Sequence, residues 1–397
     1  MPLGSCFARH NRRNAVSGSC TTMKYYYYIC NMPVLKKIVV QNFRNIELQE
    51  LEFSPNVNCI TGSNGEGKTN LIDAIYYLSM TKSAFGTPDK FNFRHGQPCF
   101  SIGGTYAMPG GMVSRFSVSV IDGEDKRVKR DDKPYGKISD HIGALPVVMV
   151  SPSDISMVSE SGEDRRRFVN AVLSQMDPQY LSSLQQYGRL LLQRNRLLKD
   201  GNCDEGLLGA FDERLSVLAA PVFAGRSQFV DELVPVVQEY YRMISDGKEQ
   251  VGIEYRSDLQ KGDLATLLLS HREKDRIFKY TTAGIQRDDF IFTMDGYPIR
   301  RCGSQGQQKS FLVALKFAQY EIMKRSYGFA PTLLLDDLFD KLDTGRVANL
   351  LKMVAGQDFG QIFLSDSNKV RVSEIVDTVT QDSAYFEAKG GAFRRWK

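Results

Sequence analysis

The sequence predicts an α/β fold: a mixed sheet flanked by helices, interrupted by an inserted antiparallel helical or short coiled-coil domain. Three observations support this prediction. A buried strand leads through a glycine-rich turn into a helix near residues 57–78, helical periodicity dominates residues 160–275, and strand patterns return from about residue 285. This order indicates one domain whose two halves are separated in the sequence.

Residues 32–155 form the first half of the divided domain. A strand at Val57–Thr61 leads into the glycine-rich turn, and the helix after it carries its apolar residues on one face: Leu71, Ile72, Ile75 and Leu78. Phe116–Val120 alternates between apolar and polar residues, and Pro146–Val150 is a continuous apolar run. We expect a half-buried strand at the first of these segments and a buried strand at the second.

Residues 156–280 form the predicted helical insertion, and residues 281–397 form the second half of the domain. Helical periodicity is expected throughout residues 160–275, with an apolar set at near-heptad spacing: Leu184, Tyr187, Leu191 and Leu198. Arg194 interrupts this set, and Pro221 and Pro235 are expected to end or kink the helices that follow. The second half opens with a strand at Phe290–Thr293 before a turn.

Composition and charge indicate a globular protein outside the membrane. The 397 residues are 42% hydrophobic and 24% charged, and no apolar run approaches the roughly 18 residues of a membrane-spanning helix. Four cysteines outside residues 1–31 lack metal-binding spacing, which is typical of reduced thiols in a cytoplasmic protein: Cys59, Cys99, Cys203 and Cys302. His95, His141 and His271 are isolated in the sequence, so we expect no metal site built from them.

The net charge of +5 is concentrated at the N-terminus. Residues 1–31 contain four basic residues, Arg9, Arg12, Arg13 and Lys24, and no acid, which leaves +1 for the remainder. The segment also lacks helical and strand periodicity. We expect it to be a non-native or disordered extension before a natural start at Met32; a targeting peptide and a DNA-binding basic arm are the alternatives.

The glycine-rich turn has the spacing of a phosphate-binding loop, between a strand and a helix as that loop requires. It comprises Gly62, Ser63, Asn64, Gly65, Glu66, Gly67, Lys68 and Thr69. Glycines let backbone N–H groups turn toward phosphates, Lys68 can reach the β- and γ-phosphates, and the Thr69 hydroxyl can bind Mg²⁺. We expect ATP to contact these residues and the following Asn70.

A second motif is an apolar strand that ends in adjacent acids, Asp336 and Asp337. A P-loop ATPase needs a carboxylate beside the metal that the phosphates hold. We therefore expect Asp336 to bind Mg²⁺ together with Thr69. Asp337 is the candidate catalytic residue that orients or deprotonates the attacking water.

A third motif opens a helix about 30 residues before this strand and contains Ser304, Gly306 and Gln307. It resembles the signature motif of ABC-type ATPases. Asn64 and the segment Asp340–Asp343 also resemble that superfamily. The resemblance implies that Ser304 binds the γ-phosphate of an ATP held by a second protomer, so that Lys68, Asp337 and Ser304 act together in catalysis.

Within that superfamily, residues 33–397 resemble the RecF family of the SMC-like branch. The matching segments are Asn42–Asn45, Ser151–Asp154, Arg165–Phe168, Gln193–Asn195, Arg287–Asp289 and Ser304–Lys309. The resemblance implies an ATP-dependent homodimer with weak DNA-stimulated ATPase activity. It also implies binding to gapped or single-strand/duplex junction DNA alongside RecR and RecO, which promotes RecA loading and SOS induction. By the same resemblance, Arg44 contacts the nucleotide.

Two parts of the site stay open at this stage. Arg165, Arg166 and Arg194 lie in the most basic part of the insertion and are candidate DNA contacts, although a charged helix face is often only solvated. Ser365 or Asp366 stands where ABC transporters have a histidine that senses the γ-phosphate. Two alternatives to a DNA-binding ATPase also remain for the function of the protein. They are the ATPase subunit of an ABC transporter and a nucleotide-gated adaptor whose slow hydrolysis acts only as a timer.

Overall fold

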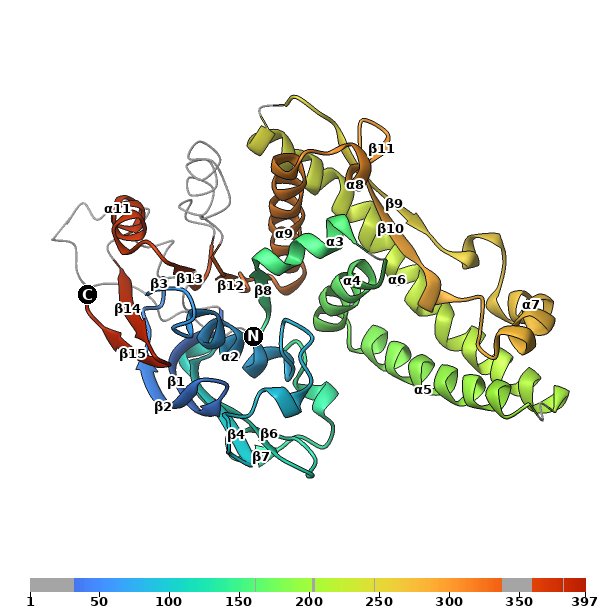
Figure 1. Cartoon of the computed structure of the whole chain (residues 1–397), viewed down its shortest axis with the longest axis horizontal. Helices are drawn as coiled ribbons and strands as arrows, with labels where there is room; N and C mark the ends of the chain where they lie inside the picture. Colours follow the sequence, from blue (N-terminus) through green and yellow to red (C-terminus); the bar gives the residue numbers. More distant parts are fainter. Residues whose placement is uncertain (1–31, 161, 202–203, 246, 338–358, 381) are drawn as a thin grey trace, which may run out of the picture.

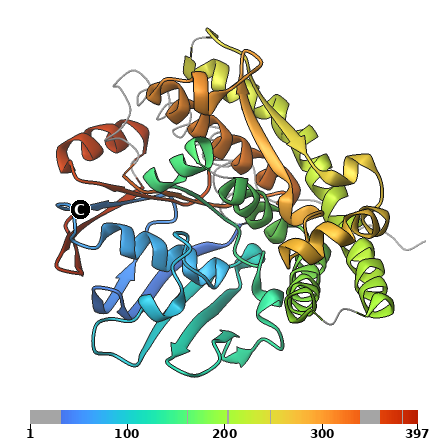
Figure 2. The same ribbon diagram turned by 45° about the vertical axis from the view of Figure 1, so that its right-hand side comes forward.

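The computed structural model describes residues 32–160, 162–201, 204–245, 247–337, 359–380 and 382–397. These residues form two lobes (Figure 1). One lobe holds two large sheets, and the other is mainly helical. Figure 2 shows helices α3 (Ser156–Ser159) and α4 (Gly162–Met176) on the side of the helical lobe that faces the sheets.

The first sheet has the order β15-β14-β3-β13-β12-β8, and all neighbours are parallel except β15 and β14. Its strands are β3 (Val57–Thr61), β8 (Val147–Val150), β12 (Thr332–Leu335), β13 (Ile362–Asp366), β14 (Ser383–Lys389) and β15 (Ala392–Arg395). The register aligns Leu335 with Leu364 and Thr61 with Asp366. The carboxyl ends of three neighbouring parallel strands therefore meet at one edge, where ligands of such sheets bind.

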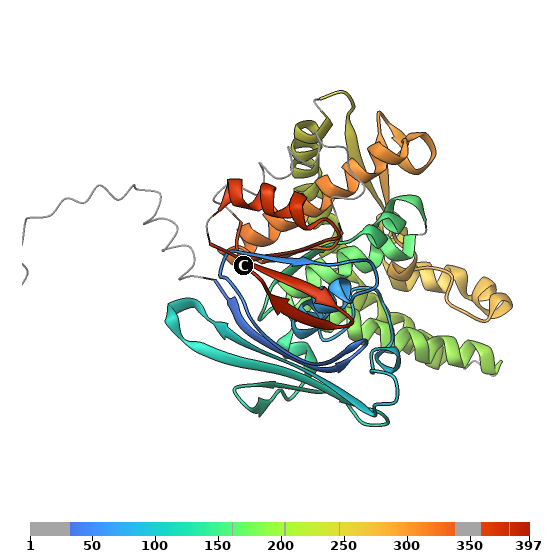
Figure 3. The same ribbon diagram turned by 60° about the vertical axis from the view of Figure 1, so that its left-hand side comes forward.

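The second sheet is antiparallel and has the order β2-β1-β4-β5-β6-β7. Its strands are β1 (Val34–Phe43), β2 (Ile46–Glu52), β4 (Cys99–Ala107), β5 (Val113–Ile121), β6 (Arg127–Arg130) and β7 (Lys133–Pro134). Helix α2 (Lys68–Met80) packs between the two sheets, and the predicted apolar face of this helix is buried. Figure 3 shows this curved sheet below the strands of the first, and α11 (Lys369–Val379) packs beside β3 on the first sheet.

The helical lobe is formed by α3 and α4 with α5 (Pro178–Asp200), α6 (Glu205–Ser245), α7 (Leu264–Phe278), α8 (Ile299–Cys302) and α9 (Gln305–Tyr327). It also contains a small antiparallel sheet of β9 (Val251–Arg256), β10 (Asp289–Met294) and β11 (Tyr297–Pro298). Short 3-10 helices lie at Asp89–Phe91, Pro109–Gly111, Ile138–His141, Pro152–Ile155, Asp258–Lys261 and Ile285–Arg287. Among the described helices, none is long and apolar enough to cross a membrane.

One expectation for the insertion is wrong, and another is wrong in part. Residues 251–256 are a strand instead of a helix, because they pair with β10 along their whole length. Helix α6 continues through Pro221 and Pro235, so neither proline ends the helix, and the alternative that they kink it stays a prediction. Both prolines face outward, while the rest of α6 packs against α5, α7, α9 and β9. This burial offsets the cost of about 3 kcal/mol that an interior proline imposes on a helix.

Other expectations are confirmed. Phe116–Val120 lies within β5 and alternates in burial, and Val147–Val150 is a fully buried strand. The turn after β10 consists of Asp295 and Gly296, both with positive φ, as a two-residue hairpin requires. The division at residues 155 and 280 stays a prediction, and the pairing of β9 with β10 joins segments from both sides of residue 280.

Candidate functional site

The predicted phosphate-binding loop connects β3 to α2 at the edge where the parallel strands end. Gly62, Gly65 and Gly67 all have positive φ. A Cβ atom at Gly62 would lie 2.6 Å from the Ala388 carbonyl oxygen, and one at Gly67 would lie 2.7 Å from the Asn45 amide nitrogen. Backbone conformation therefore favours glycine at all three positions, and close packing against the Ala388 backbone also requires it at Gly62.

Lys68 begins α2, and its side chain lies over the loop. Its Nζ donates hydrogen bonds to the Gly62 carbonyl at 2.8 Å and to the Ser63 carbonyl at 3.1 Å, and the residue is 4% exposed. A buried ammonium that rests on backbone carbonyls can exchange these weak acceptors for phosphate oxygens without a change of fold. This geometry fits the predicted phosphate contact.

Asp336 follows β12 and lies beside Thr69, as expected for two ligands of one metal ion. The Thr69 hydroxyl donates to the Asp336 carboxylate, with both Oγ1–Oδ distances at 3.0 Å. Burial raises the pKa of Asp336, as does the neighbouring Asp337, while the hydrogen bonds from Ser365 and Thr69 lower it. Carboxylate and hydroxyl oxygens are hard ligands of the kind that Mg²⁺ prefers.

Ser365, at the end of β13, connects the two acids. Its hydroxyl donates to Asp336 Oδ1 at 2.6 Å and accepts the backbone N–H of Asp337 at 3.0 Å. Both carboxylate oxygens of Asp366 instead accept hydrogen bonds from one guanidinium nitrogen of Arg371, at 2.7 and 2.8 Å. Of the two candidate sensors, the structure therefore brings Ser365, and not Asp366, to the paired acids.

A cavity of about 350 Å³ opens above these groups. It is lined by Asn64, Gly65, Gly67, Lys68, Thr69, Asn70, Pro152 and Asp337. Asp337 has a φ of 43°, in the left-handed region, and this backbone conformation is held by the bond from its N–H to Ser365. Pro152 was not predicted as a site residue. Its segment, Ser151–Asp154, was noticed only as a family motif, because no polar chemistry marks a proline.

Arg44 and Asn70 take part in hydrogen bonds that connect the start of α2 to neighbouring segments. The Arg44 guanidinium donates to Asp73 at 2.6 Å, to Ser83 at 3.0 Å and to Asn70 Oδ1 at 3.1 Å. Burial raises the pKa of Asp73, and Arg44 opposes that shift. The Asn70 amide also donates to Asn45 Oδ1 at 2.7 Å. In this conformation Arg44 is thus engaged with the protein, and its predicted contact with the nucleotide stays a prediction.

Glu66 joins the loop to the β14–β15 hairpin. Its carboxylate accepts the backbone N–H of Gly390, and its carbonyl accepts the N–H of Gly391 at 3.0 Å. Glu66 is a predicted nucleotide contact, and the sequence does not point to this partner because the hairpin lies more than 300 residues away in the chain. The last strands of the protein therefore brace the phosphate-binding loop.

Ser304 lies apart from this cavity. It caps the N-terminus of α9, where its hydroxyl accepts the N–H of Gln307 at 3.2 Å and its own N–H donates to Gln307 Oε1 at 2.7 Å. Ser304 is exposed, Gly306 and Gln307 are half-buried, and none of the three lines the cavity above Lys68. Figure 1 shows this end of α9 next to α8 and away from α2. The two halves of the predicted site are therefore separate within one chain.

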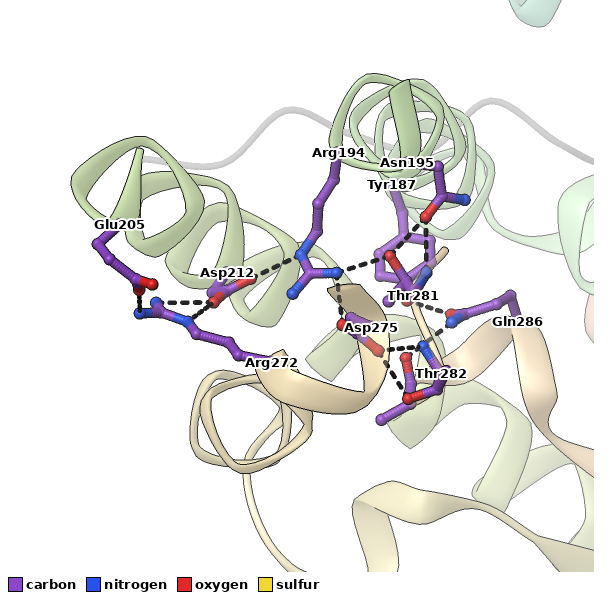
Figure 4. A network of polar contacts seen from close by, with 11 residues as sticks. Tyr187, Arg194, Asn195, Glu205, Asp212, Arg272, Asp275, Thr281, Thr282 and Gln286 are labelled. Carbon is purple, nitrogen blue, oxygen red and sulfur yellow. Dashed lines mark hydrogen bonds and ion pairs between the residues drawn. The ribbon is translucent and has the colours of Figure 1, made fainter. Parts of the chain in front are cut away.

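Two of the three expected DNA contacts are wrong. Arg194 is completely buried and pairs with Asp212 at 2.8 Å and Asp275 at 2.7 Å (Figure 4). Arg165 is 3% exposed and forms a two-pronged ion pair with Asp289. Both guanidinium groups are thus occupied by carboxylates inside the protein and out of reach of a phosphate backbone.

Arg166 differs from these two, because its side chain is only half-buried. It donates to the Asp288 carbonyl at 2.8 Å, and its role as a DNA contact stays a prediction. The predicted segment Asp340–Asp343 and the N-terminal residues 1–31 lie outside the described residues.

The fold and the site define the class of protein. The chain has the parts of a P-loop ATPase head of the ABC and SMC type. They are a strand, phosphate-binding loop and helix, a neighbouring acid-ended strand, and a separate serine-capped helix. The family described as "AAA domain" matches residues 37–199. The SMC head domain of Pyrococcus furiosus, in a complex with the C-terminal domain of ScpA, shares the fold, with a TM-score of 0.54 at 12% identity over 92% of this chain and 96% of that one.

Closer relatives identify the family. The DNA replication and repair protein RecF of Bacteroides fragilis is 42% identical over 90% of this chain and 97% of its own length, and that of Flavobacterium johnsoniae is 40% identical over 89% and 99%. A solved structure of the recombination mediator protein RecF with ATP, in the RecFOR pathway, has a TM-score of 0.83 at 29% identity over 92% of this chain and 98% of that chain. The chain belongs to the RecF family of DNA replication and repair proteins.

Proposed function

We propose that the protein is an ATP-dependent DNA clamp of recombinational repair and replication-fork maintenance. Two copies enclose two ATP molecules, the closed dimer holds DNA, and hydrolysis opens it. The observation that carries this proposal is the separation of Ser304 from the cavity of its own chain. An exposed helix N-terminus with a serine cap is a favourable anion site, and a second protomer can supply the phosphate.

The residues of one chain divide the chemistry between them. Backbone N–H groups of the loop and the Lys68 ammonium hold the phosphates, and Asp337 orients the attacking water at the cavity wall. Thr69 and Asp336 would hold Mg²⁺, which when bound offsets negative charge on the β- and γ-phosphates. Ser365 fixes both acids and is the proposed γ-phosphate sensor.

The same proposal extends to partners. By the resemblance of its motifs to the RecF family, the clamp binds gapped or single-strand/duplex junction DNA and acts with RecR and RecO to promote RecA loading and SOS induction. DNA stimulates its weak ATPase activity. These steps place the protein in the cytoplasm, where chromosomal DNA is available.

An ABC transporter subunit is the competing function, and the relatives do not favour it. The curated relatives are replication and repair proteins over nearly their whole length. A nucleotide-gated adaptor would share the dimer and differ in turnover, so ATPase rates with and without gapped DNA separate it from the clamp.

Two substitutions test the clamp. Lys68→Ala removes the phosphate contact in the same chain, and Ser304→Arg blocks the contact expected across the dimer. Both should abolish ATP-dependent dimers in analytical ultracentrifugation and DNA retention in gel shifts, while Lys36→Ala, at an exposed lysine, should behave as wild type. Ser304→Arg should still bind ATP as a monomer. Retention of ATP-dependent dimers by either site variant would contradict the mechanism.

A further inference from the structure

Glu249 is an acidic residue in the connection between α6 and β9, far from Ser304 in the sequence. Its Oε1 accepts a hydrogen bond from the Gln307 side-chain nitrogen at 2.7 Å, and its Oε2 accepts the Tyr241 hydroxyl at 3.3 Å. Tyr241 belongs to the last turns of α6 and is 1% exposed. Glu249 therefore links a rigid part of the helical lobe to the first turn of α9.

The Gln307 amide uses both of its ends in this arrangement. Its oxygen accepts the Ser304 N–H at 2.7 Å, and its nitrogen donates to Glu249. The Ser304 hydroxyl in turn accepts the N–H of Gln307. A side-chain amide has one accepting and one donating end, so a partner at one end fixes which group faces the other.

The accepting oxygen of Glu249 supports this orientation, together with the Ser304 N–H at the other end. A carboxylate only accepts hydrogen bonds, so the nitrogen of Gln307 must face it and the oxygen must face Ser304. Without the carboxylate, the amide can rotate and place its nitrogen against the Ser304 N–H, where two donors oppose each other. The capping box of α9 would then be lost in that fraction of molecules.

We propose that Glu249 is a positioning residue for the signature end of α9, acting through Gln307 on Ser304. The inference rests on the proposed ATP-dependent dimer and adds a residue from the helical insertion to it. Because the Ser304 end of α9 serves the nucleotide of the other protomer, Glu249 affects an ATP molecule that its own chain does not hold. Neither the sequence motif nor its spacing points to this residue.

Two substitutions at this position separate its charge from its hydrogen bond. Glu249→Ala should weaken ATP-dependent dimerisation about tenfold, since a charge-assisted bond is lost at both sites of the dimer, while ATP affinity of the monomer is unchanged. Glu249→Gln keeps an accepting oxygen for Gln307 and should restore most of the wild-type dimerisation. Glu239→Ala, at an exposed residue of α6, is the matched control. Unchanged ATP affinity also verifies that each variant is folded.

Mixing of variants tests the action across the dimer. Lys68→Ala is expected to form no ATP-dependent dimer with itself, but its heterodimer with Glu249→Ala keeps one complete site. That site combines the intact loop of the Glu249→Ala chain with the intact α9 of the Lys68→Ala chain. ATPase activity of the mixture should therefore exceed the sum of the two separate activities. A purely structural defect of Glu249→Ala would give no such recovery.

The outcomes are distinct. If Glu249→Ala dimerised with ATP as well as the wild type does, the role of Glu249 would be overturned and the clamp would remain. Equal weakening by Glu249→Gln and Glu249→Ala, or no recovery in the mixture, would also overturn it. A wild-type protein that does not dimerise with ATP would overturn both this inference and the proposed function.

Discussion

Asp336 and Asp337 are adjacent in the chain but stand in different surroundings. Asp336 is 3% exposed and accepts hydrogen bonds from Thr69 and Ser365, which leaves it suited to hold a cation. Asp337 lines the cavity, and its backbone is held by Ser365. One serine thus sets the positions of two acids with different proposed tasks.

This difference predicts separate effects of two conservative substitutions. Asp337→Asn should retain ATP binding and dimerisation but lower ATP hydrolysis by about 100-fold or more, because a general base contributes at least that factor. Asp336→Asn should instead weaken the Mg²⁺ dependence of nucleotide binding. Phosphate release and nucleotide titrations measure the two effects.

The exposed Asp125→Asn serves as the control for both variants. Wild-type turnover in Asp337→Asn would exclude this carboxylate as the base. An unchanged Mg²⁺ titration in Asp336→Asn would remove that residue from the metal site.

Helices α5, α6 and α7 are joined by a buried polar network centred on Arg194. Its guanidinium pairs with Asp212 of α6 and Asp275 of α7, and it also donates to Thr281 at 2.9 Å. Arg272 pairs with Asp212 from the other side at 3.0 Å (Figure 4). The residue that interrupts the apolar repeat of α5 is therefore the one that fixes its neighbours.

Arg194→Ala should destabilise the protein without reducing DNA binding by the folded molecule. We expect a loss of about 3 kcal/mol, at the low end of the range for breaking a buried pair, since Arg272 still compensates Asp212. Arg189→Ala, at an exposed site of the same helix, should change the free energy of unfolding by less than about 0.5 kcal/mol. Urea denaturation followed by circular dichroism compares them. Weaker DNA binding by the folded Arg194→Ala protein would restore Arg194 as a contact.

Local features could be predicted from the sequence, whereas pairings between distant segments could not. The loop, the acid-ended strand and the helix at Ser304 each have a short pattern with its own chemical reason, and all three form as expected. Strand β9 was missed because its pairing with β10 is a tertiary contact between segments more than 30 residues apart. Glu249 and Pro152 were missed for the same reason, since their roles exist only through residues brought to them by the fold.

Charge over the entire protein gives the strongest constraint on how DNA is held. Residues 32–397 carry a net charge of only +1, so a single copy offers little general attraction to a phosphate backbone. A closed dimer presents two copies of whatever local basic surface exists and roughly doubles the number of phosphate contacts. DNA affinity should therefore rise with ATP, and its dependence on salt should steepen.

The salt dependence of DNA binding can be measured as a slope. Binding to gapped DNA, titrated at several salt concentrations, should show a log–log slope that roughly doubles when a slowly hydrolysed ATP analogue is added. A protein that starts at Met32 should give the same slopes. If residues 1–31 were instead a DNA-binding arm, their four basic residues would contribute about 3 to 4 units of slope per chain, with or without nucleotide, and truncation would remove them. If the salt dependence did not change with nucleotide and became weaker when residues 1–31 were removed, DNA binding would be assigned to that segment. This result would contradict the clamp.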